Sequence, residues 1–226
     1  MAERRAGGKR TGAAPEPVAR VAALMRGFGR PWAVAGGWAV DAWLGRETRE
    51  HGDVDISVFY DDLQAVFEHL LGWQLLAHER GWNGSSAELW DGRPLELPAH
   101  IHCRPPEEAR PLPQDGIART EEGFWLEVLV DEREDNAWLL RREPRVALPV
   151  SDGVRRSPWG VDAVVPEVLL FFKATAYIGI PRLEDRDSDN ADFDALGPAL
   201  SSERRRWLRN AIAAVKPDHR WLARLE

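Results

Sequence analysis

Two aspartates separated by one residue are the first feature of this sequence that could do chemistry. Asp53 and Asp55 lie in the segment 53–59, Asp-Val-Asp-Ile-Ser-Val-Phe, whose alternation is typical of a strand. Both carboxylates then project from one face, while Val54 and Ile56 point into the core. Two like charges repel unless a cation neutralises them, and Mg²⁺ prefers carboxylate and phosphate oxygens. The pair predicts either a divalent metal site or an acid-rich exposed strand face.

A glycine pair stands shortly before these aspartates. Segment 31–35 predicts a short buried strand and segment 38–44 a helix, so Gly36 and Gly37 lie at the turn between them. Backbone N–H groups and the positive end of the helix dipole are exposed at such a turn, and glycine lets phosphate oxygens approach closely. The pair indicates an anion site or simply a tight turn. A phosphate-binding turn followed by paired carboxylates indicates a phosphate- and metal-binding site more specifically than either feature alone.

A third acid would complete such a site, and Glu127 is the best candidate. It lies in the alternating segment 124–130 between Leu126 and Val128, where an isolated carboxylate is costly to bury. It could ligate a metal or, as a general base, take a proton from an attacking hydroxyl. Asp131 shares its face by parity and is the rival for this role. The alternative is that Glu127 faces solvent.

Three residues near the predicted strand 53–59 each have more than one possible role. Arg49 and His51 precede the strand closely enough to touch a triphosphate or to orient a carboxylate, or they are ordinary loop residues. Asp41, one turn into the glycine-led helix, could approach a ribose or a second metal, although the helix dipole alone favours an acid there.

Two further groups have competing interpretations. His100 and His102 share a strand face near Cys103 and hint at zinc, but no further ligand pair stands at a recognised spacing. Paired strand histidines are therefore the preferred interpretation. An acidic run is either a solvated face or a site for the amines of a cationic sugar; its members are Glu184, Asp185, Asp187, Asp189, Asp192 and Asp194.

Composition bounds the class of protein. The 226 residues include 44% apolar and 30% charged residues, which argues against a disordered or membrane class. The net charge is −7 although segment 1–14 is basic, so the rest of the chain is strongly acidic. This charge argues against a nucleic-acid partner and favours a small cationic one. Cys103 is the only cysteine, which excludes an intrachain disulfide and makes the cytoplasm the expected compartment. No apolar run reaches the length of a spanning helix.

The motifs together resemble a known family. They are Gly-Gly-Trp-Ala-Val-Asp at 36–41, Leu-Gly-Arg at 44–46 and Thr-Arg-Glu-His-Gly-Asp-Val-Asp at 48–55. These are similar to the glycine-glycine-tryptophan and Asp-x-Asp motifs of bacterial aminoglycoside nucleotidyltransferases, in the 2''-adenylyltransferase-like branch of the DNA polymerase β superfamily. The similarity is strongest across residues 36–58 and continues more weakly through most of the chain.

The resemblance implies an α/β (α+β) fold of the polymerase β type, with a mixed sheet flanked by helices and a helical C-terminal part. We expect a disordered tail at 1–14, the nucleotidyltransferase domain at 15–160 and the helical part at 161–226. The implied enzyme is of the EC 2.7.7 type and is associated with antibiotic resistance. It transfers AMP or another nucleoside monophosphate from ATP or another NTP to a hydroxyl of a small cationic acceptor such as an aminoglycoside. Pyrophosphate leaves, and two Mg²⁺ ions serve as cofactors.

Two alternatives stay open: a toxin-like transfer to protein or RNA, and a non-catalytic nucleotide-binding protein of the same fold. Many superfamily members have serine at position 37, and glycine there removes a side-chain contact to phosphate while keeping the N–H. Residue by residue, the resemblance implies that Asp53 and Asp55 hold the metals, Gly36 and Gly37 cradle the β- and γ-phosphates, Glu127 is the third carboxylate, and Lys173 offsets the triphosphate charge. Without the family, Lys173 would be a lysine that extends from an apolar helix to solvent.

Overall fold

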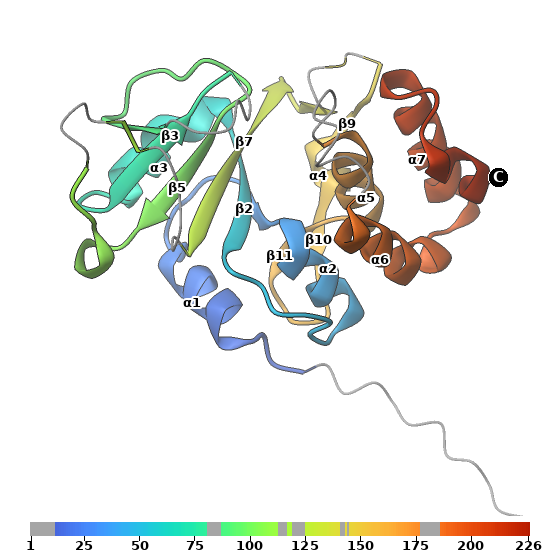
Figure 1. Cartoon of the computed structure of the whole chain (residues 1–226), viewed down its shortest axis with the longest axis horizontal. Coiled ribbons are helices and arrows are strands. Elements are labelled where there is room, and N and C mark those ends of the chain that lie inside the picture. The colour runs from blue at the N-terminus through green and yellow to red at the C-terminus, as the bar shows by residue number, and fades with distance from the viewer. Residues whose placement is uncertain are drawn as a thin grey trace, which may run out of the picture.

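The computed structural model describes residues 12–80, 87–112, 117–118, 125–140, 143, 145–176 and 186–226. A mixed sheet flanked by helices runs through this part of the chain (Figure 1). The predicted fold class is therefore confirmed. Most of segment 1–14, as well as Phe124, Glu184 and Asp185, lies outside the described residues, so the predictions for them stay predictions.

The sheet has the strand order β10-β11-β1-β2-β7-β5-β3-β4-β6, and β8 joins β7 to β9 at one end. The pairs β1–β11 and β2–β7 are parallel, whereas the other described pairs are antiparallel. The strands are β1 (Trp32–Val34), β2 (Val54–Phe59), β3 (Gln74–His78), β4 (Ala87–Leu89), β5 (His100–Arg104), β6 (Ile117–Ala118), β7 (Leu126–Glu134), β8 (Ala137–Leu139), β9 (Ala147–Pro149), β10 (Val154–Arg156) and β11 (Asp162–Val164).

The helices are α1 (Glu16–Leu24), α2 (Gly36–Leu44), α3 (Leu63–His69), α4 (Val150–Gly153), α5 (Pro166–Thr175), α6 (Asp187–Leu196) and α7 (Ser202–Val215). In Figure 1, α5, α6 and α7 gather at one end of the molecule, beside α2, while α3 lies behind β3 and β5. The C-terminal helices α5 and α6 pack against α2, the helix that begins with the glycine pair.

The two central strands β2 and β7 have an apolar face and a polar face, as their alternation predicts. Val54, Ile56, Leu126 and Val128 are all buried in the main hydrophobic core. The residues between them in sequence project from the opposite face, because successive strand side chains point to opposite sides. The sheet thus carries the candidate chemical groups on one face and is anchored by the other.

Helix α2 is fixed near its C-terminal end by a glycine cap and by a contact with the sheet. Its last residue is followed by Gly45, whose φ of 67° is left-handed and ends the helix as the sequence predicts. The indole Nε1 of Trp43 donates a hydrogen bond of 2.7 Å to the backbone oxygen of Val164 in β11. The C-terminal end of α2 is therefore fixed against β11.

The C-terminal part begins with sheet and continues with helices. Strand β11 still pairs with β1, and α5 starts at Pro166, where a proline fits the first turn of a helix. Helix α6 begins earlier than the helix expected at 192–200, and it ends at Leu196 before the 3₁₀ turn 197–199 that contains Pro198. Within the described ranges, we find no helix with the length and apolar character needed to cross a membrane.

Candidate active site

The three predicted carboxylates meet on the polar face of the sheet. The parallel register of β2 and β7 places Asp55 opposite Glu127. One oxygen from each of Asp53, Asp55 and Glu127 lies within 4.8 Å of the others, and we call these residues the carboxylate cluster. Asp131 pairs with Phe59 further along the same strands, and its Oδ2 accepts a hydrogen bond of 2.6 Å from the Ser57 hydroxyl. The rival acid is thus engaged elsewhere.

The carboxylate cluster is electrostatically unfavourable without a cation. Burial, together with the charge of Asp53, raises the pKa of Asp55 to about 6. Burial also raises the pKa of Asp53. Burial and the two aspartate charges raise the pKa of Glu127 well above its usual range. A divalent cation would remove this penalty, and an all-oxygen donor set suits Mg²⁺. The residues present therefore fit the metal that the fold implies.

Gly36 lets the carboxylate cluster approach the N-terminus of α2. Its φ is +56°, a left-handed conformation that glycine adopts readily, and a Cβ at this position would overlap the carboxylate of Asp55. The backbone N–H of Ala35 also donates a hydrogen bond of 2.9 Å to the backbone oxygen of Asp55. The residue type at position 36 thus sets the contact between the metal strand and the helix N-terminus.

Gly37 is required by two side chains that lie over it. A Cβ at position 37 would collide with the imidazole of His51 and with the guanidinium of Arg49. The space that a serine would occupy here is filled by these two groups. The first turn of α2 also has no side-chain cap, because its N-cap residue is Ala35. Backbone N–H groups, an imidazole and a guanidinium therefore surround one helix N-terminus, an arrangement that suits an anion.

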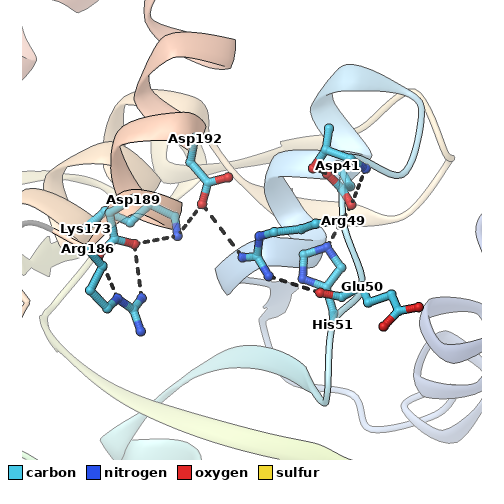
Figure 2. A network of polar contacts seen from close by, with 9 residues as sticks. Asp41, Arg49, Glu50, His51, Lys173, Arg186, Asp189 and Asp192 are labelled. Carbon is cyan, nitrogen blue, oxygen red and sulfur yellow. Dashed lines mark hydrogen bonds and ion pairs between the residues drawn. The ribbon is translucent and has the colours of Figure 1, made fainter. Parts of the chain in front are cut away.

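Asp41 holds His51 in this place. Asp41 is completely buried, and its carboxylate contacts the Nε2 of His51 at 2.7 Å and accepts a hydrogen bond of 3.1 Å from the backbone N–H of Thr48 (Figure 2). The ring of His51 packs on Trp38, with centroids 4.4 Å apart. Asp41 thus supports the loop and orients the imidazole, a role distinct from the ribose or metal contact considered from the sequence.

Lys173 enters the site from α5 within an ion network. Its Nζ lies 2.7 Å from Asp192 and 3.2 Å from Asp189, both on α6 and both buried (Figure 2). Arg186 pairs with Asp189 at 3.0 Å, and Arg49 approaches Asp192 at 3.9 Å. Lys173, Arg186 and Arg49 thus share two buried carboxylates in the described part of this network. The charge of Lys173 also lowers the pKa of Asp55, so Lys173 is electrostatically coupled to the carboxylate cluster.

The acidic run is therefore not a uniformly solvated face. Asp189 and Asp192 are buried partners of Lys173, and Asp194 pairs with Arg224. Sequence reasoning assigned these acids to solvent or to a cationic sugar and did not connect them to Lys173. The spacing of Asp189 and Asp192, on one face of a helix at i and i+3, is a signal that could have suggested a shared cation.

A second cluster of polar side chains adjoins Glu127. The expected pair His100 and His102 is joined by His78 from β3, which the sequence analysis did not single out. Cys103 instead points into the main core, where burial raises the pKa of its thiol. We call His78, His100 and His102 the histidine cluster.

Fold and site together define a class of protein. A mixed sheet with paired acids on one strand, a third acid on its parallel neighbour and a glycine-led helix N-terminus is the arrangement of a nucleotidyltransferase of the polymerase β type. The solution structure of the antibiotic-resistance factor ANT(2'')-Ia has this fold, with a TM-score of 0.51 and 19% identity over 88% of this chain and 90% of that chain.

Sequence comparison gives the same class more narrowly. Residues 17–91 match the family model described as aminoglycoside-2''-adenylyltransferase, which confirms the predicted resemblance over the part that carries the glycine pair and the Asp-x-Asp motif. The crystal structure of the lincosamide antibiotic adenylyltransferase LnuA bound to lincomycin is also similar, with a TM-score of 0.49 and 16% identity over 83% of this chain and 99% of that chain. No curated protein sequence matches this chain significantly. The chain therefore has the fold of these nucleotidyltransferases, and its residues 17–91 are similar to the adenylyltransferase family, as the motifs predicted.

Proposed function

We propose that this protein is a Mg²⁺-dependent nucleotidyltransferase that moves AMP from ATP to a hydroxyl of a small cationic acceptor, with an aminoglycoside as the first candidate. The observation that carries the proposal is the convergence of Asp53, Asp55 and Glu127 within 4.8 Å beside the glycine-led N-terminus of α2. A cation site and an anion site then stand side by side, which is what a metal–triphosphate complex needs.

The phosphates would bind at the N-terminus of α2. Gly36 and Gly37 offer backbone N–H groups there, and Arg49 and His51 lie over the second glycine. Asp41 fixes the His51 imidazole, so no reorientation of this ring is needed when an anion binds. Lys173 adds a positive charge to the site, because it is electrostatically coupled to Asp55 of the carboxylate cluster.

The carboxylate cluster would hold the metal. Asp53 and Asp55 supply the ligands, and Glu127 on the parallel neighbour β7 lies beside them. Bound Mg²⁺ supplies charge that offsets the developing negative charge on the phosphoryl oxygens and on the leaving group. The raised pKa values of these acids support this role, since they indicate a cluster that gains by coordinating a cation.

Glu127 is the group that we assign to proton removal. An oxygen of the acceptor hydroxyl attacks the α-phosphorus as its proton passes to the Glu127 carboxylate. The bond between the α-phosphorus and the bridging oxygen then breaks, and pyrophosphate leaves with that electron pair. The acidic body of the chain, with a net charge of −7, favours a cationic acceptor. The family match over residues 17–91 supports the aminoglycoside class.

The test is pyrophosphate release from each of the four common nucleoside triphosphates with Mg²⁺ across a panel of aminoglycosides. Acceptor-dependent release that Asp53→Asn loses is the expected result, and mass spectrometry of the product would identify the transferred nucleotide. Asp152→Asn, a change at an exposed acid on α4, is the matched control. Nucleotide binding by calorimetry with no release on any acceptor, protein or RNA would instead support a binding protein of this fold.

A further inference from the structure

The histidine cluster is built from two strands next to the carboxylate cluster. The antiparallel register of β3 and β5 places His78 opposite His100, and the register of β5 and β7 places His102 opposite Glu127. All three imidazoles therefore lie on the polar face of the sheet, beside the acid that belongs to the carboxylate cluster. His78 and His102 are buried, and the side chain of His100 is only 12% exposed.

The imidazole nitrogens converge. One ring nitrogen from each of the three histidines lies within 4.8 Å of the others. The Nε2 of His78 and the Nδ1 of His102 are already 3.2 Å apart. The rings of His78 and His100 stack, with centroids 4.5 Å apart and planes 8° from parallel. The cluster thus has short nitrogen–nitrogen distances in a protected location.

The geometry is close to that of a metal site. Zn²⁺–N bonds of about 2.0–2.1 Å in a tetrahedron place ligand nitrogens about 3.3 Å apart. The His78–His102 distance of 3.2 Å meets this spacing, and His100 has to close by about 1.5 Å at most, a side-chain adjustment. The ring that donates in this contact would carry its proton on its other nitrogen when both facing nitrogens coordinate, so both rings stay neutral.

The Glu127 carboxylate lies next to the histidine cluster and can approach a cation there on the side of His100. The Oε1 of Glu127 lies 3.8 Å from the Nε2 of His100 and 3.9 Å from the Nε2 of His102. Imidazole favours Zn²⁺, Co²⁺, Ni²⁺ and Cu²⁺, whereas oxygen donors suit Mg²⁺. Burial and the neighbouring rings lower the pKa of His100 to about 3, which keeps this ring in the neutral form that binds metals.

We propose that His78, His100 and His102 form a site for a transition-metal dication of the Zn²⁺ type, with Glu127 as its available carboxylate ligand. The site is separate from the carboxylate cluster in its donor chemistry and shares one residue with it. If the proposed function holds, a cation in the histidine cluster draws Glu127 away from proton removal. Zn²⁺ then inhibits nucleotidyl transfer, and removal of Zn²⁺ by a chelator restores it.

The test of binding uses Co²⁺, whose visible absorption reports tetrahedral nitrogen coordination. The whole chain, freed of metal by a chelator, is titrated with Co²⁺, and Zn²⁺ is then added to displace it. We expect one equivalent of Co²⁺ to bind with an intense visible band, both in the natural sequence and in the Asp53→Asn/Asp55→Asn variant. His78→Gln and His100→Gln should each weaken Co²⁺ binding by at least about tenfold.

The outcomes separate the two clusters. A band that the Asp53→Asn/Asp55→Asn variant loses and that both histidine variants keep would place Co²⁺ in the carboxylate cluster and overturn the proposal. Absence of the band at millimolar Co²⁺ would also overturn it. Thermal denaturation and circular dichroism confirm that each variant is folded, and two independent histidine variants protect against misfolding of one. Because Co²⁺ binding is measured without turnover, its result is distinct from the result for the proposed function.

Discussion

The carboxylate cluster and the histidine cluster occupy neighbouring parts of one sheet face but differ in donor chemistry. The first is made of oxygens from β2 and β7, and the second of nitrogens from β3 and β5. Glu127 lies between the two clusters: it belongs to the first, and its carboxylate is within 3.9 Å of two imidazoles of the second. One continuous face can thus offer separate places to Mg²⁺ and to a softer dication.

The two clusters differ in how burial changes the pKa values of their side chains. Burial raises the pKa values of Asp55 and Glu127, so these oxygen donors gain from a cation, whereas burial lowers the pKa of His100 and keeps that ring neutral. Burial disfavours the charged form in both cases, and it therefore acts in opposite directions on acids and bases. Substitutions at Asp53, Glu127, Gly37 and Lys173 test the roles assigned to the carboxylate cluster and its surroundings, and whether it is separate from the histidine cluster.

The largest effect is expected from the metal strand. Asp53→Asn removes a ligand of the proposed Mg²⁺ site, and metal charge stabilisation is worth several kcal/mol. Turnover should fall about 10³-fold. Pyrophosphate release measures the loss, and the Co²⁺ band of the histidine cluster should persist. Normal turnover in this variant would remove Asp53 from the metal site.

A substitution of Glu127, the acid that lies beside both clusters, tests its role as the general base. Glu127→Gln should lower kcat by about 10²–10³-fold, because a positioned general base contributes on that order. Affinity for the Mg²⁺–nucleotide complex, measured by calorimetry, should fall less than in Asp53→Asn. The matched variant Asp131→Asn should keep turnover within a few-fold, since its carboxylate is bound to Ser57. If the two variants exchanged these effects, Asp131 would be the base.

The glycine that faces His51 gives the next effect. Gly37→Ala forces a Cβ against the His51 imidazole and the Arg49 guanidinium. Displacing these groups from phosphate should raise the KM for nucleotide by about 10–100-fold, as charge-assisted hydrogen bonds of about 1.5–3 kcal/mol weaken. Steady-state kinetics separate KM from kcat. Gly52→Ala is the control, because a Cβ there meets nothing within 4 Å. Equal kinetics in both variants would contradict the anion site.

The smallest effect is expected from Lys173. Lys173→Ala should weaken nucleotide binding by about three- to tenfold, because two aspartates already offset much of its charge. The variant should also lose thermal stability, since Asp189 and Asp192 stay buried with fewer partners. Calorimetry gives the nucleotide Kd, and Lys216→Ala at the end of α7 is the matched control. A lower Tm with an unchanged Kd would assign Lys173 a structural role alone.

The central strands and helix α2 could be predicted because their patterns are local. Alternation at 53–59 placed Val54 and Ile56 in the core and the aspartates on the other face, as observed. Helix α6 was placed too late because its first turn consists mainly of acids and Asn190, which carry no apolar periodicity. Its acids pair with Lys173, which lies on α5, and with Arg186 at the N-cap of α6.

The sequence by itself determined the class of the protein and most of its oxygen chemistry, because the glycine pair and the Asp-x-Asp motif lie within one short segment. Tertiary structure alone decided that Asp41 holds His51, that Lys173 is shared with Asp189 and Asp192, and that His78 joins a cluster on β5. The physical reason is strand register and helix packing. Register and packing bring together residues that are far apart in the chain. The hydrophobic periodicity of a segment does not indicate which strands are neighbours in the sheet.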